Sequence, residues 1–118
     1  MKRVYLAIPY TGMEESSYEQ SVLATAAIIK NNPNVTIYSP IINSHPLTKH
    51  GLKGTWEYWQ DVDLEWLALC DTLVMVIPRE GIEKAKKSIG LESEHNCAVD
   101  KGLEILCVNF EDINDLII

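Results

Sequence analysis

Four short apolar segments, separated by longer segments with helical spacing, limit what this chain can fold into. These segments are rich in Val, Ile, Leu and Tyr, and they lack the strict alternation of polar and apolar residues that marks a half-exposed strand. We therefore expect strands buried on both faces, over Lys2–Pro9, Val35–Ser39, Thr72–Ile77 and Glu104–Val108.

The segments between these strands predict helices and loops. Apolar residues at helical spacing predict helices over Glu14–Lys30, Trp56–Leu69 and about Gly90–Asp100, the first with Ser16 or Ser17 as its N-cap. We expect loops over Ile41–Gly54 and Arg79–Lys87, and a short terminal helix or strand over Ile113–Ile118. Strands that alternate with helices pair in parallel, so this order predicts an α/β fold. The expected architecture is one domain over residues 1–118, a parallel sheet with helices on both faces.

The composition excludes several classes of partner. The 118 residues carry a formal net charge of −7 and have a pI near 4.8, so the chain repels a polyanion. We expect no nucleic-acid polymer as a partner, whereas a few local donors can still hold one phosphate of a mononucleotide. No apolar run approaches the roughly 20 residues of a membrane helix, and the N-terminal apolar run is too short for a signal peptide. We therefore expect a cytoplasmic protein without a membrane partner.

The cysteines and histidines predict no metal site. Cys70, Cys97 and Cys107 are odd in number, widely spaced and set among apolar residues, which is typical of reduced core cysteines. No spacing of His, Cys and Asp matches a zinc site, and neither a P-loop nor a dinucleotide-binding glycine motif is present. The sequence thus predicts neither a metal nor a cofactor.

The stretch from Asp63 to Glu94 holds the residues best suited to chemistry. Asp63 lies in the second predicted helix and Glu94 in the third, so the fold brings two carboxylates together, which suits chemistry at a developing positive charge. Between them, Ser88 and Gly90 precede a helix whose free first-turn N–H groups can bind an anion. Together these features indicate a nucleotide. A Ser N-cap followed by an acidic first turn explains Ser88 and Glu94 equally well.

Further candidates follow the other strands, at the edge of the sheet where α/β folds bind ligands. Pro9 and Tyr10 end the first strand, and His45 lies in a rigid loop after the second, where it can hydrogen-bond a ligand. A basic cluster precedes Ser88: Lys84, Lys86 and Lys87. This cluster could attract a phosphate, although a solvated loop explains it equally well.

These motifs cover nearly the whole chain: Val4-Tyr5-Leu-Ala-Ile-Pro9-Tyr10, Ser39-Pro40…His45-Pro46, Asp63-Leu-Glu-Trp-Leu…Cys70-Asp71 and Ser88-x-Gly90-x-x-x-Glu94. In this order they resemble the nucleoside 2-deoxyribosyltransferase superfamily, which includes the 2′-deoxynucleoside 5′-phosphate N-hydrolases. Within the superfamily, the chain is most similar to a small phage and bacterial branch of uncharacterised proteins with a Ser-His-Pro loop.

The resemblance implies a flavodoxin-like fold and assigns roles to four residues. Glu94 would attack the anomeric carbon of the deoxyribose, and Tyr5 would hydrogen-bond this nucleophile. Asp63 would handle the base or position the sugar, and Ser88 would hold a 5′-phosphate. Relatives complete each site with a residue from a neighbouring subunit, so the resemblance also implies a homodimer or a higher homo-oligomer.

Two hypotheses of different classes follow. The first is an N-glycosidase, either a hydrolase or a transferase, that releases the base of a nucleoside or its 5′-monophosphate through Glu94. The second is a module on the same fold that binds or senses a nucleotide without turnover. A phosphorelay receiver is rejected, because Pro9-Tyr10 and Pro78-Arg79 occupy the places where a receiver needs acidic residues. The base, the sugar and the acceptor stay open.

Overall fold

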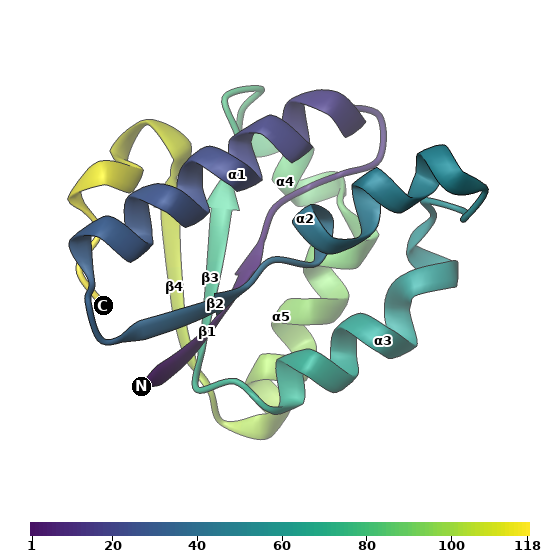
Figure 1. The fold of residues 1–118 in the computed structure, drawn as a ribbon. Helices are drawn as coiled ribbons and strands as arrows, with labels where there is room; N and C mark the ends of the chain where they lie inside the picture. The colour runs from purple at the N-terminus through teal and green to yellow at the C-terminus, as the bar shows by residue number, and fades with distance from the viewer.

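A four-stranded parallel sheet forms the centre of the molecule (Figure 1). The computed structural model describes residues Met1–Ile118. It contains strands β1 (Lys2–Ala7), β2 (Val35–Tyr38), β3 (Thr72–Ile77) and β4 (Glu104–Asn109), in the order β2-β1-β3-β4. All neighbouring pairs are parallel, and Tyr5 in β1 lies opposite Tyr38 in β2 and Leu73 in β3. This order confirms the predicted α/β class and is consistent with a flavodoxin-like fold.

Helices cover both faces of the sheet, as predicted (Figure 1). The helices are α1 (Glu14–Asn31), α2 (Pro40–Ser44), α3 (Trp56–Ala68), α4 (Ile82–Lys87) and α5 (Ile89–Lys101), with 3-10 helices η1 (His45–His50) and η2 (Phe110–Asp115). Helix α1 packs beside η2 on one face, and α3 packs beside α5 on the other. No helix is long and apolar enough to cross a bilayer.

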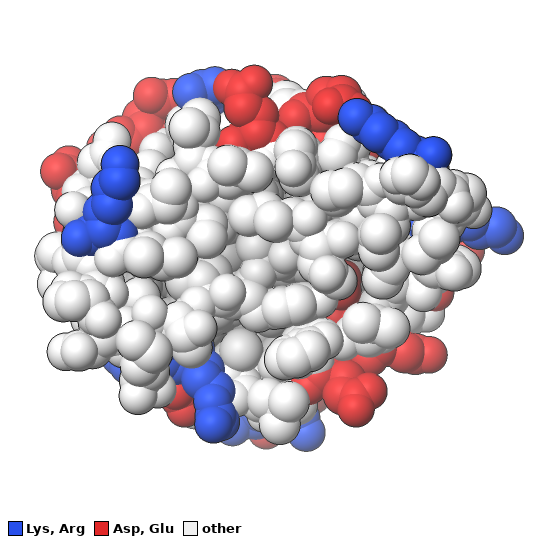
Figure 2. Space-filling view, viewed as in Figure 1, with Lys and Arg blue, Asp and Glu red and all other residues white.

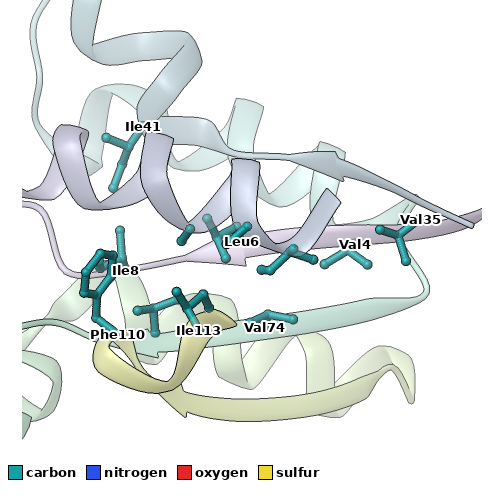
Figure 3. Packing of buried hydrophobic residues seen from close by; sticks show 12 residues of the cluster. Val4, Leu6, Ile8, Val35, Ile41, Val74, Phe110 and Ile113 are labelled. Atoms are coloured by element: carbon teal, nitrogen blue, oxygen red, sulfur yellow. The ribbon is translucent and has the colours of Figure 1, made fainter. Parts of the chain in front are cut away.

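Each face of the sheet has its own apolar cluster, because successive residues of a strand point to opposite faces. Val4, Leu6 and Ile8 point toward α1 and η2, where they join a cluster of 12 buried residues (Figure 3). Tyr5 and Ala7 point toward α3 and α5 and join a second cluster of 7 buried residues. Strand β1 therefore contributes to both cores.

Two segments predicted as loops contain helices. Within Ile41–Gly54 the structure has α2 and η1, and α2 begins one residue earlier with Pro40 in its first turn. Ser39 caps this helix by accepting a hydrogen bond of 3.4 Å from the Ile42 N–H, and a serine cap followed by proline favours a helix start. Within Arg79–Lys87 the structure has α4, whose residues are not buried and therefore show no apolar period.

The predicted N-cap of the first helix was wrong. Helix α1 begins at Glu14, with Met13 at the cap position, so both serines lie inside the helix. Both side chains make tertiary contacts instead. The Ser16 hydroxyl donates to Glu80 at 2.5 Å, and the buried Ser17 hydroxyl donates to the Pro9 carbonyl at 2.7 Å. The second contact attaches α1 to the loop that follows β1.

The cysteines are only partly core residues. All three are free thiols: Cys70 is buried, Cys97 is half-buried and Cys107 is exposed. Cys107 lies on β4, which is an edge strand, so its side chain is not enclosed. The prediction of a core position was wrong for Cys107.

Candidate active site

A cleft of about 930 Å³ lies at the carboxyl ends of the strands. It is bordered by the segment after β1, by α2 and η1 beside β2, by the first half of α3, and by α4 and the start of α5 beside β3. Strand β1 has β2 on one side and β3 on the other, so the connections leave β1 and β2 in opposite directions along the sheet. Parallel sheets bind ligands at such a switch point. Of the eight predicted site residues, the cleft is lined by seven: Pro9, Tyr10, His45, Asp63, Ser88, Gly90 and Glu94.

Tyr5, the eighth, lies beneath the cleft and contacts it through Glu94. Its side chain is fully buried, and its hydroxyl donates a hydrogen bond to Glu94 Oε2. Glu94 lies on the buried side of α5 and is 5% exposed. The predicted contact between the tyrosine and the glutamate is therefore present, and it links the centre of the sheet to the floor of the cleft.

Asp63 is the second buried carboxyl group of the floor. Helix α3 buries Asp63 and Leu67, which lie one turn apart on the same side of the helix. Asp63 is 6% exposed, and its Oδ1 atom has no hydrogen-bond partner. A buried carboxyl oxygen without a partner is costly, so the group is suited to a ligand that supplies the missing donor.

Both carboxyl groups hold their proton more tightly than usual. Burial raises the pKa of Asp63 from 3.8 to about 7. Burial also raises the pKa of Glu94 from 4.5 to about 8; the hydrogen bond from Tyr5 opposes this increase, and the negative charge of Asp63 adds to it. Two carboxyl groups with raised pKa values in one cleft are suited to acid–base chemistry near neutral pH.

The side of the cleft next to β3 is suited to an anion. Ser88 is the N-cap of α5 and accepts a hydrogen bond of 3.1 Å from the Leu91 N–H, so its own hydroxyl hydrogen stays free to donate. Lys84 and Lys87 line the same side, whereas Lys86 forms an exposed ion pair with Glu83 at 3.6 Å and does not line the cleft. A helix N-terminus, a hydroxyl donor and two lysine side chains thus border this side of the cleft.

Gly90 has a different structural role from the one its sequence context indicates. A Cβ atom at Gly90 would lie 3.2 Å from the ring of Trp56, which packs against the first turn of α5. The missing side chain therefore allows an aromatic ring, and not only a ligand, to approach the helix. Trp56 was not among the predicted site residues, although it begins the predicted helix and lines the cleft.

The side of the cleft next to β2 is aromatic and polar. The Tyr10 hydroxyl lies 2.6 Å from His45 Nδ1, and His45 Nε2 lies 3.1 Å from Glu15 Oε1. The Tyr18 ring stacks on the imidazole, with ring centroids 4.8 Å apart. Tyr10 and His45 were predicted as ligand contacts. Glu15 was missed, because it resembles an ordinary acidic residue in the first turn of a helix.

Comparison with known proteins adds no family to this description. A scan against protein-family models and a search of curated proteins both find no match. No group of three or more His, Cys, Asp and Glu side chains is arranged to hold a metal ion. The functional interpretation therefore rests on the residues of the cleft.

Proposed function

We propose that this protein breaks the N-glycosidic bond of a nucleoside or of a deoxynucleoside 5′-monophosphate, with Glu94 as the nucleophile. The proposal includes membership of the nucleoside 2-deoxyribosyltransferase superfamily. One observation carries it: two buried carboxyl groups, Asp63 and Glu94, lie on the floor of a cleft that has anion donors on one side. Glycosidic cleavage needs such a pair, one to attack the sugar and one to assist the leaving group.

Glu94 would form the covalent bond. Its carboxylate attacks the anomeric carbon, and the electron pair of the C–N bond leaves with the base, giving a glycosyl ester and free base. The ester is then cleaved by water, which yields the sugar or sugar phosphate, or by a second base, which yields a new nucleoside. The hydrogen bond from Tyr5 orients the glutamate and stabilises its anionic form when it departs from the sugar.

Asp63 would serve the departing base. A base leaves more readily when it gains a proton or a hydrogen bond at a ring nitrogen, and a carboxylic acid with a raised pKa is a suitable donor. As positive charge develops on the sugar during C–N cleavage, it favours the anionic form of the adjacent Glu94, while a protonated Asp63 can donate to the departing base.

The side next to β3 would hold the 5′-phosphate. Ser88 and the first-turn N–H groups of α5 offer hydrogen bonds, and Lys84 and Lys87 offer positive charge. Lys84 also approaches the loop after β1, since a Cβ atom at Gly12 would lie 3.8 Å from its Nζ. A local positive region can thus hold one phosphate in a chain whose net charge is −7.

The proposal extends to a homodimer. Helix α3 and the residue after it carry exposed apolar side chains: Tyr58, Val62, Trp66 and Leu69. Figure 2 shows broad uncharged surface across the middle of its view, with charged side chains gathered toward the periphery. Sedimentation velocity should give twice the monomer mass of 13.3 kDa, and a monomer at micromolar concentration would contradict this part of the proposal.

Base release from a substrate panel tests the chemistry. Purified protein is incubated with nucleosides and 5′-monophosphates, both ribo and deoxy, and free base is measured by chromatography. Glu94→Gln should lower the rate of base release by roughly a thousandfold or more, because it removes the nucleophile and keeps its shape. The matched control is Glu92→Gln, two residues earlier on the same helix, where the side chain is exposed and the rate should not change.

The outcomes separate the two functional classes. Release by wild type and by Glu92→Gln, but not by Glu94→Gln, supports the glycosidase. Saturable binding of one panel member without release of any base, unaffected by Glu94→Gln, would replace it by the nucleotide-binding module. Equal base release by wild type and Glu94→Gln would contradict the assigned nucleophile.

A further inference from the structure

Glu15, His45 and Tyr10 form a chain of hydrogen bonds that runs from solvent into the cleft. Glu15 is 79% exposed at its side chain and His45 is 6% exposed. The distances are 3.1 Å from Glu15 Oε1 to His45 Nε2 and 2.6 Å from His45 Nδ1 to the Tyr10 hydroxyl. The chain connects the start of α1, the start of η1 and the segment after β1, so three parts of the fold position one hydroxyl group.

The surrounding contacts hold this chain in one geometry. The Tyr18 ring stacks on the imidazole at an interplanar angle of 28° and fixes its plane. Thr48 donates a hydrogen bond of 2.7 Å to the His45 carbonyl and fixes its backbone. A Cβ atom at Gly54 would lie 3.6 Å from the Tyr10 hydroxyl, so the backbone of the loop before α3 closes over the tyrosine. The hydroxyl therefore has little freedom to reorient.

The chemistry of the chain determines what Tyr10 can offer to a ligand. The Glu15 carboxylate only accepts hydrogen bonds, so the proton of a neutral His45 lies on Nε2. Nδ1 then carries a lone pair and accepts the only hydrogen of the Tyr10 hydroxyl. What remains on the Tyr10 oxygen is lone-pair density, so within the cleft it can accept a hydrogen bond but cannot donate one.

The position of Tyr10 relates this acceptor to one part of the proposed substrate. The anion donors Lys84, Lys87 and Ser88 lie beside β3, and the carboxyl pair lies on the floor, whereas Tyr10 contacts His45 beside β2. If the phosphate of a nucleotide lies next to β3 and its anomeric carbon lies above Glu94, its base is the group left to face Tyr10. Trp59 also lines the cleft and offers apolar surface to a planar ring.

We propose that Tyr10, positioned by His45 and Glu15, selects bases that present an amino group or a ring N–H to its oxygen. This inference rests on the proposed function, since it names the class of base that the same cleft accepts. A site built to accept a hydrogen bond discriminates against an analogue without the donor, because the bound base then covers an acceptor that is left unpaired. Tyr10 is thus a specificity residue, and Glu15 and His45 are positioning residues.

Matched pairs of ligands test the selection. Binding is measured by calorimetry at pH 8.5, in the Glu94→Gln background so that no ligand is consumed. The pairs are dAMP with purine deoxyriboside 5′-phosphate, dCMP with its 2-pyrimidinone analogue, dIMP with 1-methyl-dIMP, and dTMP with 3-methyl-dTMP. In at least one pair the donor-bearing member should bind about tenfold more tightly, as one net hydrogen bond allows.

Substitutions in the hydrogen-bond chain should reduce or abolish the preference for donor-bearing ligands. Tyr10→Phe keeps the ring and removes the acceptor, so the two members of the pair should bind equally. Glu15→Gln changes an exposed residue, so folding is not at risk. Its amide can donate a hydrogen bond to His45 Nε2, which would reverse the direction of both hydrogen bonds of the chain. The preference for the donor-bearing ligand should then fall several-fold. The control is Tyr58→Phe, an exposed tyrosine on α3 outside the cleft, which should keep the full preference.

The possible results distinguish this inference from the proposed function. A preference that is lost in Tyr10→Phe and retained in Tyr58→Phe supports the inference. Binding without any donor preference, or a preference unchanged by Tyr10→Phe, overturns the inference and leaves the proposed function standing. If no nucleotide of any pair binds, the proposed function fails and the inference fails with it.

Discussion

The two faces of the sheet are built from the same strands but differ in what they enclose. The face covered by α1 and η2 encloses an apolar cluster of 12 buried residues. The face covered by α3 and α5 encloses a cluster of 7, and beside it lie the titratable groups of Tyr5, Asp63 and Glu94. One face therefore supplies the larger apolar core, with the chain from Glu15 to Tyr10 at its edge, and the other combines a smaller core with the carboxyl pair of the candidate site.

Strand β1 contributes both to the apolar core and to the candidate site. Leu6 points into the apolar face and is 1% exposed, while its neighbour Tyr5 points to the other face and hydrogen-bonds Glu94. A parallel strand at the centre of the sheet is buried on both sides, so one side can carry a polar group only if a partner satisfies it. Glu94 is that partner, because it accepts the hydrogen bond of the Tyr5 hydroxyl.

Truncation of Leu6 should affect only the apolar face, and it has the largest expected effect. Leu6→Ala should lower the free energy of unfolding by about 3 kcal/mol, because it removes buried methyl groups and leaves a cavity. Chemical denaturation measures this change. Base release per folded molecule should stay within about twofold of wild type, since Leu6 does not contact the cleft.

An exposed leucine provides the control for this substitution. Leu23→Ala changes the same residue type on the solvent side of α1, where 45% of the residue is exposed, and should change stability by less than about 0.5 kcal/mol. If Leu6→Ala also abolished base release in fully folded protein, the two faces would be coupled and the comparison between them would fail.

Substitution of Asp63 should have the opposite effect, with activity lost and stability gained. A carboxyl group whose pKa is higher in the folded state stabilises the fold fully below its unfolded pKa, and that contribution is lost as the pH rises through its folded pKa. For Asp63 this window runs from about pH 4 to about pH 7. Asp63→Asn should therefore raise the free energy of unfolding by about 2 kcal/mol at pH 9, after allowance for partial solvent screening, and by almost nothing at pH 4.

Thermal unfolding over this pH range checks the prediction. Asp61→Asn, an exposed residue on the same helix, should not change the pH dependence of the melting temperature. A stability difference between Asp63→Asn and wild type that stays constant from pH 4 to pH 9 would show that the carboxyl group is not held at a raised pKa.

The fold could be predicted from the sequence where burial leaves a pattern. The third strand was predicted at Thr72–Ile77, as observed, because its central position makes it apolar on both faces. Helix α4 could not be predicted, since none of its residues is buried and no apolar period marks it. Residues such as Ser17 were misassigned because their roles depend on tertiary partners, here the Pro9 carbonyl.

The candidate site divides in the same way. Asp63 and Glu94 could be selected because the alternation of strands and helices places both at one edge of the sheet. The hydrogen-bond chain from Glu15 through His45 to Tyr10 could not be foreseen. Glu15 and His45 are 30 residues apart, and no periodic pattern in the sequence connects these residues. The effect of Trp56 on Gly90 is likewise a packing contact between two helices, which leaves no signal in either one.

Ser88 serves stability and ligand binding at once, so it gives the smallest and most selective prediction. Ser88→Ala should cost about 1 kcal/mol of stability through loss of the cap on the Leu91 N–H. It should weaken binding of 5′-monophosphates but not of nucleosides. Ser88→Asp should restore the cap and repel the phosphate, so that stability returns while selectivity for the monophosphate is lost.

The control is Ser39→Ala, which removes the cap of α2 and should leave phosphate selectivity unchanged. If Ser88→Asp bound monophosphates as tightly as wild type, the phosphate would lie elsewhere in the cleft, and the role of Ser88 would be limited to capping α5.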